Sequence, residues 1–209
     1  MNVVFDFGGV LFGWKPARLI ASTFPELATT DEAAHELGRA VFSHDDWQQF
    51  DAGMLDIPQV VQRTAQRLAL PRGRLLHLVQ GIGDCLMPMP DIVAVLADLK
   101  AKREGGAGLK LYYLSNMPEA YARVLESRHE FLKWFDGGIF SGDVNLIKPD
   151  ARIYQLLARQ YQLEPAETFF IDDLAHNIDA AQALGWRAAR FESAELLRKQ
   201  LVNHQLLNV

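Results

Sequence analysis

Short apolar runs that end abruptly in polar or glycine residues constrain the fold of this chain more than any other feature. Four such runs span residues 3–5, 109–114, 138–140 and 168–171, and a weaker fifth lies near 186–191. Runs this short, and apolar on both faces, are typical of buried parallel strands. The segments between most of the runs repeat apolar residues at helical spacing, as in 92–99, 153–161 and 178–184. Strands that alternate with helices predict an α/β fold, here a Rossmann-like doubly wound parallel sheet.

A long stretch without a convincing strand follows the first run. Within it, residues 16–41 and 57–70 carry amphipathic helical patterns. A crossover of this length between neighbouring strands indicates an insertion rather than a simple connection. We therefore expect an α/β core made of residues 1–14 and 88–209, and a small helical cap made of residues 15–87.

Composition and charge exclude several classes of protein. The chain has 209 residues, 49% of them hydrophobic and 22% charged, which suffices for a packed core without disulfides. A net charge of −5 and the lack of a Lys/Arg-rich run argue against nucleic-acid binding. No apolar run approaches the roughly 18 residues that cross a bilayer. With its single cysteine, Cys85, and a start unlike a signal peptide, the chain is expected to be soluble and cytoplasmic. Its oligomeric state is left open.

Polar side chains follow the predicted strands at the points where the strands end. They are Asp6, Ser115, Asn116, Asp172 and Asp173, and Lys148 follows the third strand shortly before Pro149. In a doubly wound sheet, ligands bind outside the carboxyl ends of the strands. We therefore expect these residues to converge on one crevice.

This set of residues has a chemical rationale. Two like charges about 4 Å apart repel by on the order of 4 kcal/mol at an effective dielectric near 20, so three carboxylates need a cation among them. Carboxylates without a nearby histidine or cysteine favour a hard divalent ion such as Mg²⁺. Together with Lys148 and hydroxyl or amide donors, such a site would receive a phosphoryl group, whose transfer depends on positioning and charge neutralisation.

Four segments carry a resemblance to a known family. They are Phe5–Leu11, Leu114–Asn116, Lys148–Asp150 with Tyr154, and Ile171–Asp173 with Asn177. In this order and at these strand ends, they resemble motifs I to IV of the haloacid dehalogenase-like hydrolase superfamily. The resemblance covers nearly the whole chain and implies a Rossmann-like core with a cap.

The resemblance also implies roles for individual residues. Asp6 would be the nucleophile that takes the phosphoryl group as an aspartyl-phosphate. Mg²⁺ would be held by Asp6, the Gly8 carbonyl and Asp173, with Asp172 as a direct or indirect partner. The phosphate would be bound by Ser115, Asn116 and Lys148, which makes the expected partner a small phosphorylated metabolite.

Position 8 departs from the pattern of most phosphatases in this superfamily. They carry a second aspartate there as general acid and base, whereas this chain has Gly8. The proton would then come from water, from the substrate or from a cap residue such as His44. Haloacid dehalogenases also lack this aspartate, but they do not need an acidic pair such as Asp172 and Asp173. The presence of this pair therefore favours a phosphorylated substrate. The segments 5–10 and 148–154 further resemble a bacterial α-glucose-1-phosphate phosphatase branch, which favours sugar phosphates.

Three alternatives to this Mg²⁺-dependent phosphatase stay open. A dehalogenase-type hydrolase would use Asp6 on a carbon centre without a metal. A phosphomutase would need a bound sugar bisphosphate and a better acid. A catalytically weak binding or regulatory protein would keep the phosphate pocket but lose turnover through Gly8.

Overall fold

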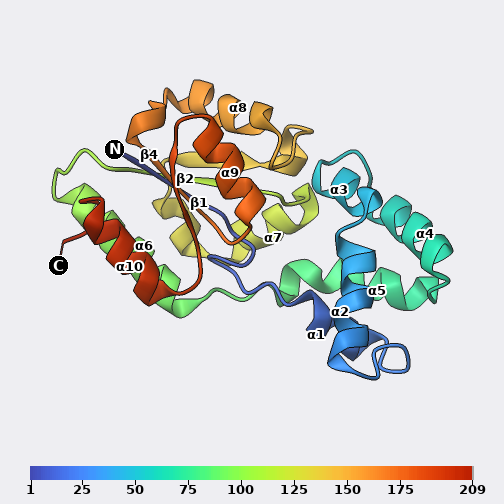
Figure 1. Ribbon diagram of the computed structural model, residues 1–209. Helices are drawn as coiled ribbons and strands as arrows, with labels where there is room; N and C mark the ends of the chain where they lie inside the picture. Colours follow the sequence, from blue (N-terminus) through green and yellow to red (C-terminus); the bar gives the residue numbers. More distant parts are fainter. Residues whose placement is uncertain (209) are drawn as a thin grey trace.

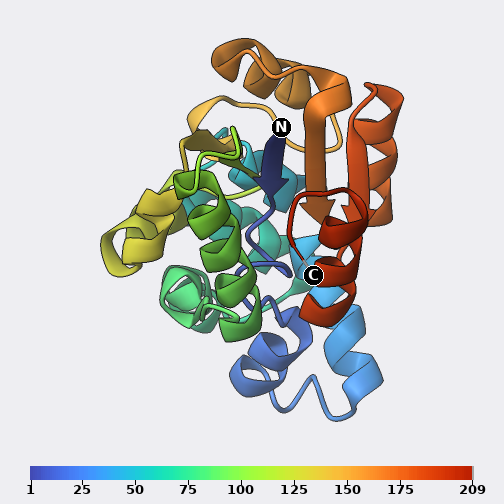
Figure 2. The same ribbon diagram turned by 90° about the vertical axis from the view of Figure 1, so that its left-hand side faces the viewer.

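The computed structural model describes residues 1–208, which contain one parallel sheet. Its five strands are β1 (Asn2–Phe5), β2 (Lys110–Ser115), β3 (Gly137–Phe140), β4 (Thr168–Asp172) and β5 (Arg187–Arg190). They lie in the order β3-β2-β1-β4-β5 and all neighbouring strands pair in parallel. In Figure 2, β1 and β4 run side by side in the same direction. The predicted α/β fold and the places of its strands are confirmed.

Helices cover both faces of the sheet. They are α6 (Pro90–Glu104), α7 (Glu119–Arg128), α8 (Ala151–Tyr161), α9 (Ala175–Ala183) and α10 (Ala194–Asn203). Alternate residues of β1 point to opposite faces, so Val3 and Phe5 pack with α6 and α10 while Val4 packs with α8 and α9. Figure 1 shows α8 and α9 on one side of the strands and α6 and α10 on the other.

Short 3₁₀ helices lie between these elements, at Glu130–Trp134, Ser141–Asp143 and Pro165–Glu167. Among residues 1–208, no helix combines the length and apolar character that crossing a membrane requires.

A separate group of helices lies between β1 and α6 in the sequence and stands to one side of the sheet (Figure 1). Its members are α1 (Pro16–Thr23), α2 (Asp31–Phe42), α3 (Asp45–Asp51), α4 (Ile57–Leu68) and α5 (Arg72–Cys85). We call residues 16–85 the helical insertion. The helix predicted over 16–41 is wrong in one respect, because it divides into α1 and α2. Pro25 disfavours a helical backbone at Phe24, and Thr30 then caps α2 by accepting a hydrogen bond from Ala33 N at 3.1 Å.

The register of the sheet aligns the ends of its central strands. Phe5 pairs with Tyr113 on one side and with Ile171 on the other. The backbone N–H of Asp6 donates a hydrogen bond to Ile171 O at 2.9 Å, which places Asp6 beside Asp172 at the carboxyl edge of the sheet. The chain passes from β1 to β2 and β3 on one side and then crosses over to β4 and β5 on the other, so the direction of the connections changes at β1 and a crevice opens at its carboxyl end.

The end of α3 contacts the core just beyond β3. Ser141 Oγ donates a hydrogen bond to the main-chain oxygen of Asp51 at 2.6 Å, and Asn145 Nδ2 donates to Ala52 O at 2.9 Å. The next residue, Gly53, has a φ of +71°, and an ideal Cβ built there would overlap Gly142 O. The helical insertion therefore docks on the core through backbone groups that only a glycine lets approach this closely.

This close approach predicts the effect of adding a single methyl group. Gly53→Ala should destabilise the protein by roughly 1–3 kcal/mol, because alanine is strained at positive φ and its Cβ meets backbone. The control, Gly81→Ala inside α5, meets no atom within 4 Å and should stabilise instead, by about 0.5–1 kcal/mol. Urea unfolding of both variants measures the difference, and equal stabilities would contradict the close docking.

Candidate active site

One buried lysine joins two carboxylates at the carboxyl edge of the sheet. Lys148 Nζ lies 2.9 Å from Asp6 Oδ1 and 2.6 Å from Asp172 Oδ2. All three side chains are buried, and they come from β1, β4 and the loop before α8. The predicted convergence of strand-end residues is therefore present in the structure for these three groups.

The backbone of Lys148 is held by Asn116. Asn116 Nδ2 donates to Lys148 O at 2.9 Å, and Lys148 N donates to Asn116 Oδ1 at 2.7 Å. Asn116 does not cap the next helix, because α7 begins after Pro118 without a side-chain cap. The side chain of Asn116 instead fixes the loop that carries the lysine.

Asp172 has its carboxylate oxygens occupied by protein donors. Asn177 Nδ2 lies 2.9 Å from Oδ1 and 3.0 Å from Oδ2, and the N–H of Leu174 donates to Oδ1 at 2.9 Å. Lys148 Nζ also donates to Oδ2, so protein donors hold both oxygens of this carboxylate in place. Asp173 differs, because it is half-buried and lines an open cavity.

Burial and neighbouring charges shift the pKa values at this site. Burial raises the pKa of Asp6 from 3.8 to about 7, Lys148 opposes this shift, and Asp172 adds to it. Burial and the charge of Asp172 also raise the pKa of Asp173. Burial acts to lower the pKa of Lys148, but Asp172 and Asp6 more than compensate and raise it. One lysine therefore does not neutralise the carboxylates around it.

The carboxylates are arranged so that they could hold a metal ion. Asp6, Asp172 and Asp173 each offer an oxygen, and these atoms lie within 4.8 Å of one another. A donor set made only of oxygens suits a hard divalent cation such as Mg²⁺. Ser115 Oγ, at the end of β2, is fully buried and has no hydrogen-bond partner among the described residues, so it has an unused hydroxyl.

A cavity of about 440 Å³ opens above this cluster, between the core and the helical insertion. From the predicted site it is lined by Asp6, Gly8, Asn116, Lys148 and Asp173. Its apolar walls include Trp14, Phe42, Trp47, Ile82, Leu86 and Tyr121. Its polar lining on the insertion includes His35, Arg39, Gln48 and Asp51. The walls are therefore largely apolar and aromatic, while most of the charge lies at the base.

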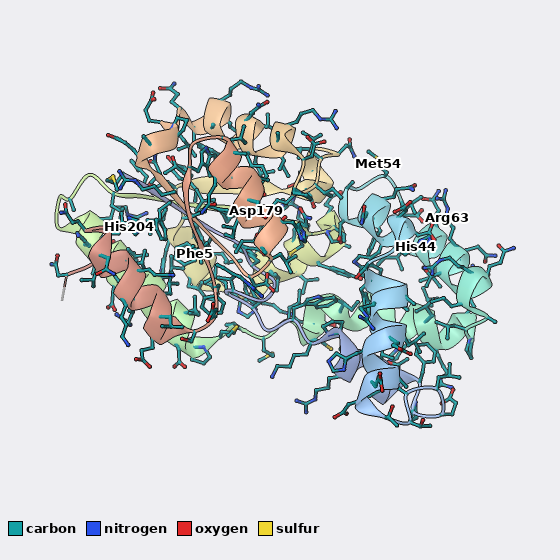
Figure 3. The ribbon with its side chains drawn as sticks, viewed as in Figure 1. Phe5, His44, Met54, Arg63, Asp179 and His204 are labelled. Atoms are coloured by element: carbon teal, nitrogen blue, oxygen red, sulfur yellow. The ribbon has the colours of Figure 1, made fainter. Side chains whose placement is uncertain are left out.

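The sequence did not single out Asp51, which the structure brings to this cavity. Its main-chain oxygen is 2.6 Å from Ser141 Oγ, a contact between residues ninety positions apart in the sequence. In the sequence around Asp51, the only indication of a special position is that a helix ends at Asp-Ala-Gly. His44, which the sequence offered as a source of protons, contacts Asp46 at 3.0 Å instead and is not among the residues that line the cavity. Figure 3 places His44 near Arg63, among the insertion helices and well away from Phe5.

Solved structures of other proteins show the same fold. A HAD family enzyme from Bacteroides thetaiotaomicron, in complex with magnesium and inorganic phosphate, matches with a TM-score of 0.68 at 20% identity, over 91% of this chain and 93% of that one. The L-2-haloacid dehalogenase of Xanthobacter autotrophicus matches with a TM-score of 0.68 at 23% identity, over 99% and 84%. At these identities the likeness shows the fold alone.

Sequence comparison identifies the family. The sesquiterpene phosphatase astK of Aspergillus oryzae is 29% identical over 87% of this chain and 85% of its own. The phosphorylated carbohydrates phosphatase of Thermotoga maritima is 24% identical over 88% and 81%. A family model described as haloacid dehalogenase-like hydrolase matches residues 1–185. The chain therefore belongs to the haloacid dehalogenase-like hydrolases, which confirms the predicted family and the predicted hydrolase class.

Proposed function

We propose that this protein hydrolyses phosphate monoesters of small metabolites, with Mg²⁺ as cofactor and Asp6 as the nucleophile. The observation that carries the proposal is the cluster of Asp6, Lys148, Asp172 and Asp173 at the base of one cavity. Two relatives named as phosphatases and the magnesium and phosphate complex of a structural neighbour support it.

The contacts of each carboxylate suggest how the metal-binding roles divide. Asp173 lines the cavity, so we assign it with Asp6 and the Gly8 carbonyl to the Mg²⁺ ion. Asp172 already contacts Lys148 and Asn177, so its proposed role is to hold the lysine in place. Bound Mg²⁺ would offset the negative charge of the carboxylates and of the phosphoryl oxygens.

The proposed reaction begins at the carboxylate of Asp6. Its Oδ1 accepts a hydrogen bond from Phe7 N at 2.7 Å and contacts Lys148, which leaves Oδ2 as the attacking oxygen. Attack on phosphorus gives an aspartyl-phosphate and releases an alcohol, and water then regenerates Asp6. Ser115, Asn116 and Lys148 are proposed to bind the phosphoryl oxygens, with Lys148 supplying the positive charge.

The substrate class rests on the cavity walls. The predicted sugar phosphate would use the polar groups of the insertion, such as Arg39 and Gln48. Trp14, Phe42 and Leu86 form an apolar wall, which favours an ester whose organic part is apolar. One relative is named for sesquiterpenes and another for phosphorylated carbohydrates, so both classes have a counterpart among the relatives. We favour the apolar class because the walls are largely apolar, with four aromatic side chains, Trp14, Phe42, Trp47 and Tyr121, among them.

The nucleophile is tested by Asp6→Asn. The change keeps size but removes the nucleophilic charge, so turnover should fall by about 10³ or more, which is about 4 kcal/mol of barrier. The matched control, Asp179→Asn, removes an exposed carboxylate of α9 and should leave turnover unchanged. Phosphate release is measured for both folded proteins. Near-normal turnover of Asp6→Asn would refute the covalent mechanism.

The metal is tested by removing divalent ions with a chelator. Hydrolysis should stop, return with Mg²⁺, and return poorly with Ca²⁺, which is larger and coordinates more loosely. Full activity on phosphoesters after exhaustive chelation would contradict the role of the acidic cluster. Metal-free release of halide from a 2-haloacid, without phosphatase activity, would instead establish the dehalogenase alternative.

The substrate class is tested by comparing farnesyl phosphate with glucose 1-phosphate. Farnesyl phosphate should have the higher kcat/KM. Phe42→Ala should lower that value by about tenfold or more, because burying an aromatic side chain against a ligand contributes about 1.5–3 kcal/mol. The same variant should change kcat/KM for glucose 1-phosphate much less. A preference for glucose 1-phosphate that Phe42→Ala leaves intact would favour the sugar class.

A further inference from the structure

In the proposed hydrolysis, the oxygen of the leaving alcohol needs a proton, and none of the residues assigned so far donates it. An alcohol leaves poorly as an alkoxide, and a general acid accelerates such steps by roughly 10²–10⁴. Position 8, which lines the cavity together with Asp6, is a glycine. We propose, on the basis of the phosphatase function above, that Asp51 of the helical insertion is the general acid that protonates the leaving oxygen.

The position of Asp51 supports this role. It is the last residue of α3, it is half-buried, and it lines the same cavity as Asp6 and Lys148. Its main-chain oxygen is bound by Ser141 Oγ, and the oxygen of Ala52 by Asn145 Nδ2. These contacts fix the end of α3 against the core, and with it the main-chain position from which the Asp51 side chain extends.

The electrostatic surroundings favour the protonated form of this carboxyl group. Burial raises the pKa of Asp51 well above its usual value of 3.8, and the charge of Asp6 raises it further, while Lys148 acts in the opposite direction. Lys148 already contacts two other carboxylates, at 2.9 and 2.6 Å. A carboxyl group that stays neutral beside a negatively charged nucleophile has the property that a general acid needs.

Three other proton donors on the insertion and on α7 are less suited. His44 is paired with Asp46, outside the cavity lining. The hydroxyl of Tyr121 already donates to Val79 O at 2.7 Å, and burial raises its pKa well above its usual value. His35 is exposed and its Nδ1 lies 2.6 Å from a main-chain oxygen of its own helix.

The proposed step balances in charge and protons. As Asp6 Oδ2 forms its bond to phosphorus, the bond from phosphorus to the ester oxygen breaks, and that oxygen takes the proton of Asp51. The alcohol leaves, and Asp51 is now a carboxylate. Asp51 then takes a proton from the water that attacks the phosphorus. Phosphate leaves, Asp6 is free again, and Asp51 is protonated as at the start.

The test is Asp51→Asn, which keeps shape and removes the proton donor. Its effect should depend on the leaving group. In kcat/KM, which reports the steps up to release of the alcohol and not the later attack of water, alkyl phosphates, which need a proton, should lose about 10²–10³, whereas p-nitrophenyl phosphate, which does not, should lose less than about tenfold. The rate should therefore fall steeply with leaving-group pKa in the variant and only weakly in the wild type. Asp46→Asn, which removes a carboxylate of the same helix outside the cavity lining, should change neither rate.

A second variant tests whether the lost group is a proton donor. Gly8 has room for a side chain, since the nearest atom to an ideal Cβ is Trp14 Cβ at 3.9 Å. Its φ also lies outside the positive range in which L side chains are strained. Gly8→Asp introduced into Asp51→Asn should therefore restore part of the lost rate on alkyl phosphates, while changing the aryl substrate little.

The outcomes separate this inference from the function on which it rests. Unchanged hydrolysis of alkyl phosphates by folded Asp51→Asn would overturn the acid role. An equal loss of kcat/KM on alkyl and aryl substrates would also overturn it, because it would show a positioning role instead. If no phosphate ester is hydrolysed in an Asp6-dependent way by the wild type, the proposed function itself fails.

Discussion

The ion pairs of Lys148 hold the two sides of the site together. One buried ammonium group contacts carboxylates from β1 and β4, and its own backbone is fixed by Asn116 after β2. Removing one partner of a buried ion pair typically costs about 3–5 kcal/mol, because the remaining charge is left uncompensated. With Asp173 added, the cluster has more negative than positive charge, so it suits a phosphate dianion and a divalent cation together better than a phosphate alone.

The charged groups of the cavity and its aromatic walls come from different parts of the chain. The charged groups at the base of the cavity come from strand ends and the adjoining loops of the core, where the parallel register fixes their spacing. Most of the aromatic walls come from the helical insertion and the segment that leads into it, including Trp14, Phe42 and Trp47. Changes in the insertion can therefore alter which organic group fits without disturbing the ion pairs.

Local sequence patterns predicted the strands and the residues at their ends well, because each depends on a few consecutive residues. Asp6 and Asp172 were expected at the crevice because each follows a buried apolar run, and the sheet register then brings them together. Contacts between distant residues were not predictable in this way. Asn116 holds the backbone of a residue thirty-two positions away instead of capping the next helix. Asp51 reaches the cavity through a hydrogen bond to Ser141, and nothing in its local sequence indicates that partner.

Because the proposed acid belongs to the insertion, proton transfer to the leaving group depends on how the insertion docks on the core. An aspartate at position 8 would belong to the core wherever the insertion lies, because both it and Asp6 would stand in the segment that follows β1. Asp51 instead depends on the contacts that Ser141 and Asn145 make with the end of α3. Proton donation to a poor leaving group then requires a docked insertion, whereas attack by Asp6 does not. Since the insertion also supplies most of the walls that enclose the organic group, the same docked arrangement would select the substrate and complete the catalytic site.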